Sequence, residues 1–135
     1  MPFKFENLEV WQLSIEYVDL MYQLGDSLPR QEEYNLKSQL IRAATSVSLN
    51  IAEGSTGQSD PEQARFLSMA IRSLLETVAC LHLIRRRNYL SDASMLDVAY
   101  SKAEILAAKL HNFRKALVPE KYAIKDEEAL YVIKD

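Results

Sequence analysis

Few residues in this 135-residue chain have side chains that could carry chemistry. A di-iron carboxylate site in a helical bundle needs Glu-x-x-His pairs, but Ala79 and Ala108 stand three residues before His82 and His111. Neither histidine has a second histidine or a carboxylate at a metal-ligand spacing in its own segment. We therefore expect no metal and no cofactor, and we interpret both histidines as structural or surface residues.

The single cysteine, Cys80, has no base or oxyanion-binding group near it in the sequence, so we do not expect it to act as a nucleophile. It falls at helical spacing from three small residues, Ala70, Ser73 and Thr77, where a thiol acts as a small apolar filler. The stretch at residues 54–57, Gly-Ser-Thr-Gly, lacks the lysine of a phosphate-binding loop. We expect no catalytic residue and a protein that is not an enzyme.

One set of side chains is cationic and is a candidate for binding nucleic acid, because clustered Lys and Arg release counterions from a phosphate backbone. Its members are Arg85, Arg86, Arg87, Lys102, Lys109, Arg114 and Lys115. The alternative interpretation is that these cations complement the dipole at a helix C-terminus and keep the protein soluble.

A second set forms a polar strip shared by two predicted helices. Its members are Arg42, Asn50, Glu53, Arg72 and Glu76. Two interpretations remain open for this strip. It is either a solvated face with a weak ion pair, or a buried polar network that sets the register of subunits.

The charge is distributed unevenly along the chain, although its net value is only −3. Residues 1–53 carry eight acids and four bases, whereas residues 60–117 carry six acids and nine bases. An acidic first half and a basic second half can dock against each other between subunits, or the basic half can meet a polyanion.

The chain contains only three glycines and four prolines, which favours a few long helices over a turn-rich β fold. The apolar spacing predicts helices over about residues 8–24, 36–53, 59–87 and 91–117. Because the last two connections are short, we expect an all-α, antiparallel up-down-up-down four-helix bundle over residues 1–117. Residues 118–135 form a predicted tail that is irregular or packed on a partner.

The first predicted helix has two apolar rows, where an ordinary surface helix has one. One row is Leu8, Trp11, Ile15, Val18 and Tyr22, and the other is Val10, Leu13, Tyr17, Leu20 and Leu24. We expect one row to face the core and the second, Val10 to Leu24, to be covered by another subunit. The second predicted helix stops at Gly54, which we interpret as a left-handed cap.

Three blocks of sequence carry a resemblance to a known family: FENLEVWQ at 5–12, EYNL at 33–36 and QLIRAATSVSLNIAEG at 39–54. Over residues 3–117 the chain resembles the four-helix bundle proteins encoded in intervening sequences of bacterial 23S ribosomal RNA genes. The resemblance implies a bacterial cytosolic protein and a ring-shaped homo-oligomer, a pentamer, as in the related accessory protein of diversity-generating retroelements. That relative binds nucleic acid and its reverse transcriptase partner, whereas most of the family has no known activity.

From the residues and the resemblance together we expect a non-enzymatic homo-oligomer that associates with RNA or another nucleic acid. The alternative is a scaffold for a protein partner that does not bind nucleic acid. No stretch approaches the roughly 18 to 20 apolar residues of a membrane span. The lone cysteine also fits a reducing compartment, so we expect a cytoplasmic protein with no membrane partner.

Overall fold

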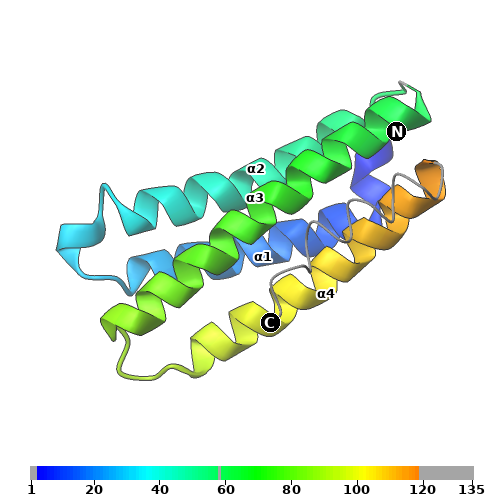
Figure 1. The fold of residues 1–135 in the computed structure, drawn as a ribbon. Coiled ribbons are helices and arrows are strands. Elements are labelled where there is room, and N and C mark those ends of the chain that lie inside the picture. The colour runs from blue at the N-terminus through cyan, green and yellow to red at the C-terminus, as the bar shows by residue number, and fades with distance from the viewer. Residues whose placement is uncertain (1–2, 58, 119–135) are drawn as a thin grey trace.

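The computed structural model describes residues 3–57 and 59–118, and every regular element in that part of the chain is helical. The long helices are α1 (Glu9–Asp26), α2 (Leu36–Gly54), α3 (Asp60–Arg87) and α4 (Ser94–Leu117). Two short 3-10 helices, η1 (Lys4–Asn7) and η2 (Arg30–Glu32), precede α1 and α2. Successive long helices run in opposite directions (Figure 1), which confirms the predicted up-down-up-down four-helix bundle. Apart from Val118, the predicted tail lies outside the described residues.

Each long helix packs against the next one in the chain, and α4 returns to pack against α1. The connection between α1 and α2 therefore joins neighbours and does not cross the bundle. In this arrangement α1 and α3 lie diagonally across the core. We call the end that carries the α1–α2 linker and the α3–α4 loop the loop end. The opposite end, where η1 lies and α4 finishes, is the terminal end (Figure 1).

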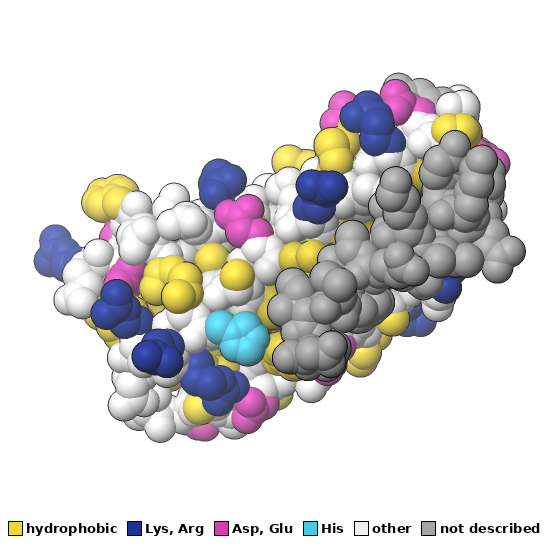
Figure 2. Space-filling model, in the orientation of Figure 1, with side chains coloured by type: hydrophobic (Ala, Val, Ile, Leu, Met, Phe, Trp, Pro, Cys, Tyr) yellow, Lys and Arg dark blue, Asp and Glu magenta, His cyan; other side chains and the backbone are white. Residues whose placement is uncertain are grey.

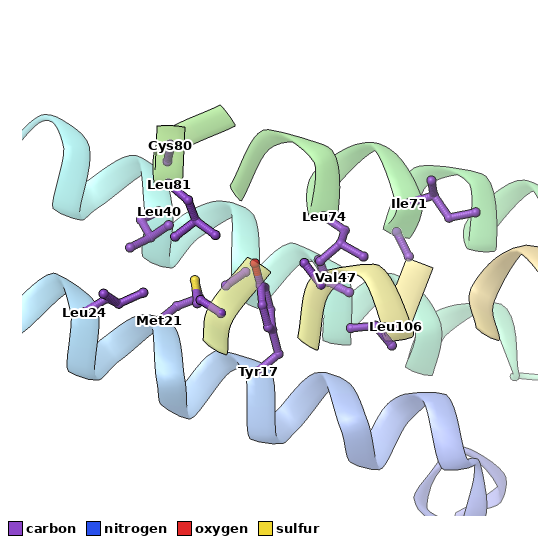
Figure 3. Close-up of a cluster of buried hydrophobic side chains, with 14 of the residues drawn as sticks. Tyr17, Met21, Leu24, Leu40, Val47, Ile71, Leu74, Cys80, Leu81 and Leu106 are labelled. Atoms are coloured by element: carbon purple, nitrogen blue, oxygen red, sulfur yellow. The ribbon is translucent and has the colours of Figure 1, made fainter. Parts of the chain in front are cut away.

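The core contains a polar contact that spans this diagonal. The hydroxyl of Tyr17 on α1 lies 2.8 Å from the hydroxyl of Thr77 on α3, which itself donates to the Leu74 carbonyl at 2.6 Å. Burial raises the pKa of Tyr17 to about 12 because it disfavours the phenolate. Figure 3 shows the Tyr17 side chain reaching between apolar residues of the other helices. Since both hydroxyls are paired, the core carries these polar groups without an unsatisfied donor.

The prediction that another subunit covers the row from Val10 to Leu24 on α1 is wrong. Val10, Tyr17 and Leu24 are buried within their own bundle, and Leu13 and Leu20 are half-buried against the core. Leu13 and Tyr17 line a small hollow with α4 residues, so this row faces α4. The other row faces α2, because Gly25, seven residues beyond Val18, lies against Lys37 and Ile41. A helix that packs against two neighbouring helices has a wide apolar arc even within a single chain. The arc of α1 therefore requires no second subunit.

Gly54 also departs from the prediction. It is the last residue of α2 and has no left-handed backbone, since Gly57 is the one glycine with positive φ. A Cβ built on Gly54 would lie 2.8 Å from the Cβ of Phe66 on α3. The position therefore requires glycine because two helices approach closely there, and the cap that follows is Ser55.

Among the described helices, α3 is long and apolar enough to suit a membrane span, with a mean hydropathy of 1.5 over its most apolar window. In the bundle its apolar side chains Leu67, Leu74 and Leu81 are buried in the core. Its start is capped by Ser59, whose hydroxyl accepts from the Glu62 amide at 3.3 Å. The Glu62 carboxylate pairs with Arg65 at 2.6 Å.

Candidate nucleic-acid interface

The seven predicted cations do not form one surface. Arg85 lies opposite Asp97, near the start of α4, and Arg86 and Arg87 complete α3 at the loop end. The last three, Lys109, Arg114 and Lys115, lie about 18 to 27 Å farther along α4, at a rise of about 1.5 Å per residue. Lys102 lies between these two groups, where it lines a small hollow with Leu13 and Tyr17 of α1. The cationic set is therefore spread along the bundle.

The α4 cations are also less available than their sequence positions suggest. Arg114 is only 3% exposed and donates to the Ser68 hydroxyl at 3.1 Å, so the prediction that it contacts nucleic acid is wrong. Its spacing of four from Leu110 and three from Leu117 places it on the core-facing side, a signal that the charge obscured. Lys109 pairs with Glu9 of α1 at 3.2 Å.

The loop end is held together by a carboxylate that sequence reasoning missed. Glu32 is only 8% exposed and accepts hydrogen bonds from the Tyr89 hydroxyl at 2.5 Å and the Asn35 side chain at 2.9 Å. The Leu36 amide adds a third bond at 3.3 Å. The pKa of Glu32 is lowered, chiefly by the Tyr89 bond and in smaller part by the charge of Arg87. Nothing in the acidic sequence Glu32-Glu33 distinguishes the buried residue from its exposed neighbour.

The Glu32 contacts bring the α1–α2 linker beside the end of α3, which places Arg30 at the same end as Arg86 and Arg87. These three exposed arginines are the loop-end cations. Most acids of this end are already matched, because Lys37 bridges Asp26 and Glu33 at 3.3 Å each, and Arg85 pairs with Asp97 at 2.6 Å. Figure 2 shows Lys and Arg side chains gathered at the loop end.

A hollow of about 220 Å³ lies between α3 and α4, and Arg85 is the arginine that lines it. Its floor is formed by the buried side chains of Leu81 and Leu96. The rings of His82 and Tyr100 form two of its walls, with centroids 5.9 Å apart and planes at 80°. We call it the aromatic hollow; the Arg85–Asp97 ion pair completes its lining.

The polar strip is only partly assembled. Arg42 donates to Glu76 at 3.0 Å, and both side chains are largely open to solvent, which makes this a weak surface pair. Asn50 donates to the backbone and hydroxyl oxygens of Ser46 at 2.9 and 3.0 Å. Ser46 in turn meets Ser73 of α3 at 2.9 Å, a contact that the sequence did not suggest. The two other predicted members, Glu53 and Arg72, are exposed and lie outside this network.

The residues considered for catalysis or metal binding lie in different parts of the bundle and do not form a common site. Cys80 is buried in the core, and burial raises the pKa of its thiol, which disfavours the reactive thiolate. His111 is buried near the terminal end, whereas His82 is exposed toward the loop end. Across residues 3–57 and 59–118, no three His, Cys, Asp or Glu side chains are grouped to hold a metal ion.

The family model described as "23S rRNA-intervening sequence protein" matches residues 6–112. No curated protein matches the chain. A crystal structure of a protein of unknown function from the S23 ribosomal protein family of Bacteroides thetaiotaomicron is similar, with 24% identity and a TM-score of 0.72. The match covers 78% of this chain and 98% of that one.

At 24% identity, the likeness to the Bacteroides protein shows the shared fold alone. The family match is more informative because it extends from η1 into the last turns of α4 and so spans most of the bundle. It also contains all three sequence blocks on which the resemblance depends, except for Phe5. The chain therefore belongs to the 23S rRNA-intervening sequence protein family.

Proposed function

We propose that this protein is a non-enzymatic, cytoplasmic helical scaffold that assembles with copies of itself and associates with RNA through its loop end. The observation that carries the RNA part is the exposed group of loop-end cations, Arg30, Arg86 and Arg87. The family description adds support, since it refers to an intervening sequence of 23S ribosomal RNA. The non-enzymatic part is supported by the burial of Cys80, which raises the pKa of its thiol and so disfavours the nucleophilic thiolate.

Local charge matters more than the net charge of −3 for this proposal. At physiological salt, charges farther apart than about 8 Å are largely screened from one another. An RNA strand at the loop end therefore responds mainly to the arginines there, because Lys37 and Arg85 already neutralise nearby acids. The favourable term is the release of counterions from the phosphates that these arginines contact.

The test is a titration of a fluorescently labelled, structured fragment of 23S ribosomal RNA at several salt concentrations. We expect the double variant Arg86→Ala/Arg87→Ala to bind more weakly and to have a shallower salt dependence. Each lost phosphate contact should reduce the slope of log K against log salt by about 0.7 to 0.9. Arg85 is left unchanged because it pairs with Asp97.

The matched control is Lys4→Ala/Arg72→Ala, which removes two exposed cations that lie away from the loop end and make no ion pair in the described part of the chain. It lowers the net charge equally but leaves the loop end intact. Equal losses in the two double variants would mean that RNA responds only to total charge. If the unaltered protein binds no RNA at low salt, the RNA part of the proposal is wrong.

The self-assembly part is supported by the apolar surface beside α1 and α2. The α2-facing row is only partly covered, with Trp11 and Ile15 half-buried and Tyr22 exposed. Next to this row, a groove of about 440 Å³ lies between η1 and α2, and Phe5 of the groove packs edge-on against Trp11 at 4.8 Å. The family resemblance favours a pentamer as the product of assembly.

The same groove favours the competing function, a protein-interaction scaffold that does not bind RNA. Phe3 is 72% exposed and Leu49 is 61% exposed at its rim, so an apolar segment of another protein would gain buried area there. This alternative predicts no RNA binding by the unaltered protein and no effect of the arginine substitutions. The RNA titration therefore separates the two functions.

A further inference from the structure

We infer that the aromatic hollow between α3 and α4 is a stacking site for an unpaired nucleobase of the RNA. This inference rests on the proposed RNA association and adds to it the kind of RNA that is bound. The hollow, of about 220 Å³, can admit one planar base against the side chains that line it, on one side of the His82–Tyr100 pair. It lies at the loop end, where Arg86 and Arg87 can reach the attached phosphates.

The side chains that form the floor and walls of the hollow are apolar or aromatic, which suits the flat faces of a nucleobase. Leu81 and Leu96 provide an apolar floor, and the nearly perpendicular rings of His82 and Tyr100 provide two adjoining walls. Bases in single-stranded RNA are commonly stacked on aromatic side chains, which bind any base because each has a π-face. The walls therefore favour stacking without requiring a particular sequence.

The rim of the hollow matches the edge of a base. Arg85 and Asp97 are paired through one guanidinium nitrogen and one carboxylate oxygen at 2.6 Å. The second oxygen of Asp97 can accept a hydrogen bond, and the remaining N–H groups of Arg85 can donate one. A base edge carries both donors and acceptors, so it can bind to this ion pair without breaking it.

Arg86 supplies the contact for the backbone of the same nucleotide. It lies four residues beyond His82 on α3, so both side chains are on one face of the helix. Arg86 is exposed and makes no ion pair with the described part of the chain. A base in the hollow thus leaves its phosphate beside a cation, which is the arrangement of single-strand binding surfaces.

Tyr100 differs from the two tyrosines whose hydroxyls are bonded inside the bundle, because its side chain is partly open to solvent. The hydroxyls of Tyr17 and Tyr89 are bonded inside the bundle, whereas Tyr100 is 41% exposed and its hydroxyl has no partner among the described residues. Its ring is held in place by the His82 contact alone among the aromatic pairs. An aromatic wall that is partly open to solvent is suited to a ligand that arrives from solvent.

The experiment uses a labelled ten-nucleotide single strand of mixed sequence and the same strand annealed to its complement. We expect the unaltered protein to bind the single strand more tightly than the duplex, because paired bases cannot enter the hollow. Tyr100→Ala should weaken single-strand binding by roughly five- to 150-fold, the range measured for loss of one stacked base. Tyr100→Phe should restore binding, since it keeps the ring.

Two further readouts distinguish stacking from a change in charge or folding. Tyr100→Ala should leave the salt slope unchanged, whereas Arg86→Ala should reduce it by about 0.7. The His82 ring signals in the NMR spectrum should shift when the single strand is added. The matched control is Ile105→Ala, a residue of α4 that is also about half exposed but lies outside the aromatic hollow.

Four outcomes overturn the inference: equal binding of single strand and duplex, an unchanged affinity in Tyr100→Ala, an equal loss in Ile105→Ala, or unmoved His82 signals. If Tyr100→Ala binds normally while Arg86→Ala/Arg87→Ala binds weakly, the stacking site is wrong and the proposed RNA association stands. If the unaltered protein binds neither the ten-nucleotide probe nor the 23S fragment, both proposals fail together.

Discussion

The loop end and the terminal end of the bundle close the same four helices with different side chains. At the loop end, the Glu32 carboxylate accepts three hydrogen bonds and joins the α1–α2 linker to the loop that follows α3. At the terminal end, Phe3 stacks on Phe5, Phe5 packs on Trp11, and α2 meets α3 through Gly54. One end is thus closed by directional polar bonds and the other by aromatic contact and close packing.

This difference shows how a small bundle can present two kinds of surface. Polar closure of the loop end leaves arginines free to face a polyanion. Apolar closure of the terminal end leaves a groove with exposed Phe3 and Leu49. We therefore expect substitutions at the terminal end to alter packing and assembly, and substitutions at the loop end to alter electrostatics and its dependence on pH.

The largest expected effect is on packing at the terminal end. Gly54→Ala should lower the free energy of unfolding by about 1 to 3 kcal/mol, because the new Cβ would lie 2.8 Å from the Phe66 Cβ. Urea titration followed by circular dichroism measures this change. Gly25→Ala is the control, since its new Cβ meets the flexible Lys37 side chain at 3.1 Å. We expect the control to be neutral or stabilising by up to about 1 kcal/mol; equal losses would contradict the close-approach argument.

A smaller effect should appear in assembly. Leu49→Ser should weaken self-association by about 1 to 2 kcal/mol for each subunit interface that buries this side chain. Leu49 is 61% exposed in the single chain and would be covered by a second copy. Light scattering over a range of protein concentrations measures this shift. Leu83→Ser, at a residue that is 52% exposed near the loop end, should leave the mass unchanged. A monomer at micromolar concentration in the unaltered protein would remove self-assembly from the proposed function.

The smallest effect should be a pH-dependent one at the loop end. The folded-state pKa of Glu32 is lowered from its ordinary value of 4.5, chiefly by the Tyr89 bond. Its contribution to stability is therefore complete above about pH 4.5 and is lost as the pH falls through the lower folded-state pKa. Glu32→Gln should melt a few degrees below the unaltered protein at pH 7, and the gap should close in acid. Thermal melts of both proteins at pH 7 and in acid test this. If the difference in melting temperature is the same at the two pH values, the charge of Glu32 does not contribute to stability.

The sequence alone determined the helices and their order with small errors. Apolar residues at steps of three and four predicted segments 8–24, 36–53, 59–87 and 91–117, close to the observed Glu9–Asp26, Leu36–Gly54, Asp60–Arg87 and Ser94–Leu117. It also placed the three arginines at the end of α3, where they complement the helix dipole. These features are local, because the residues that produce them are neighbours along the chain.

Only the tertiary structure decided which neighbour covers each face. It showed that Val10, Tyr17 and Leu24 pack inside their own bundle and that Arg114 is buried. It also showed that Glu32, and not the adjacent Glu33, accepts from Tyr89. Each of these outcomes depends on contacts between residues far apart in the chain, such as Tyr17 with Thr77, 60 residues later. Periodicity reveals that a face is apolar, but the packing of distant segments determines what lies against it.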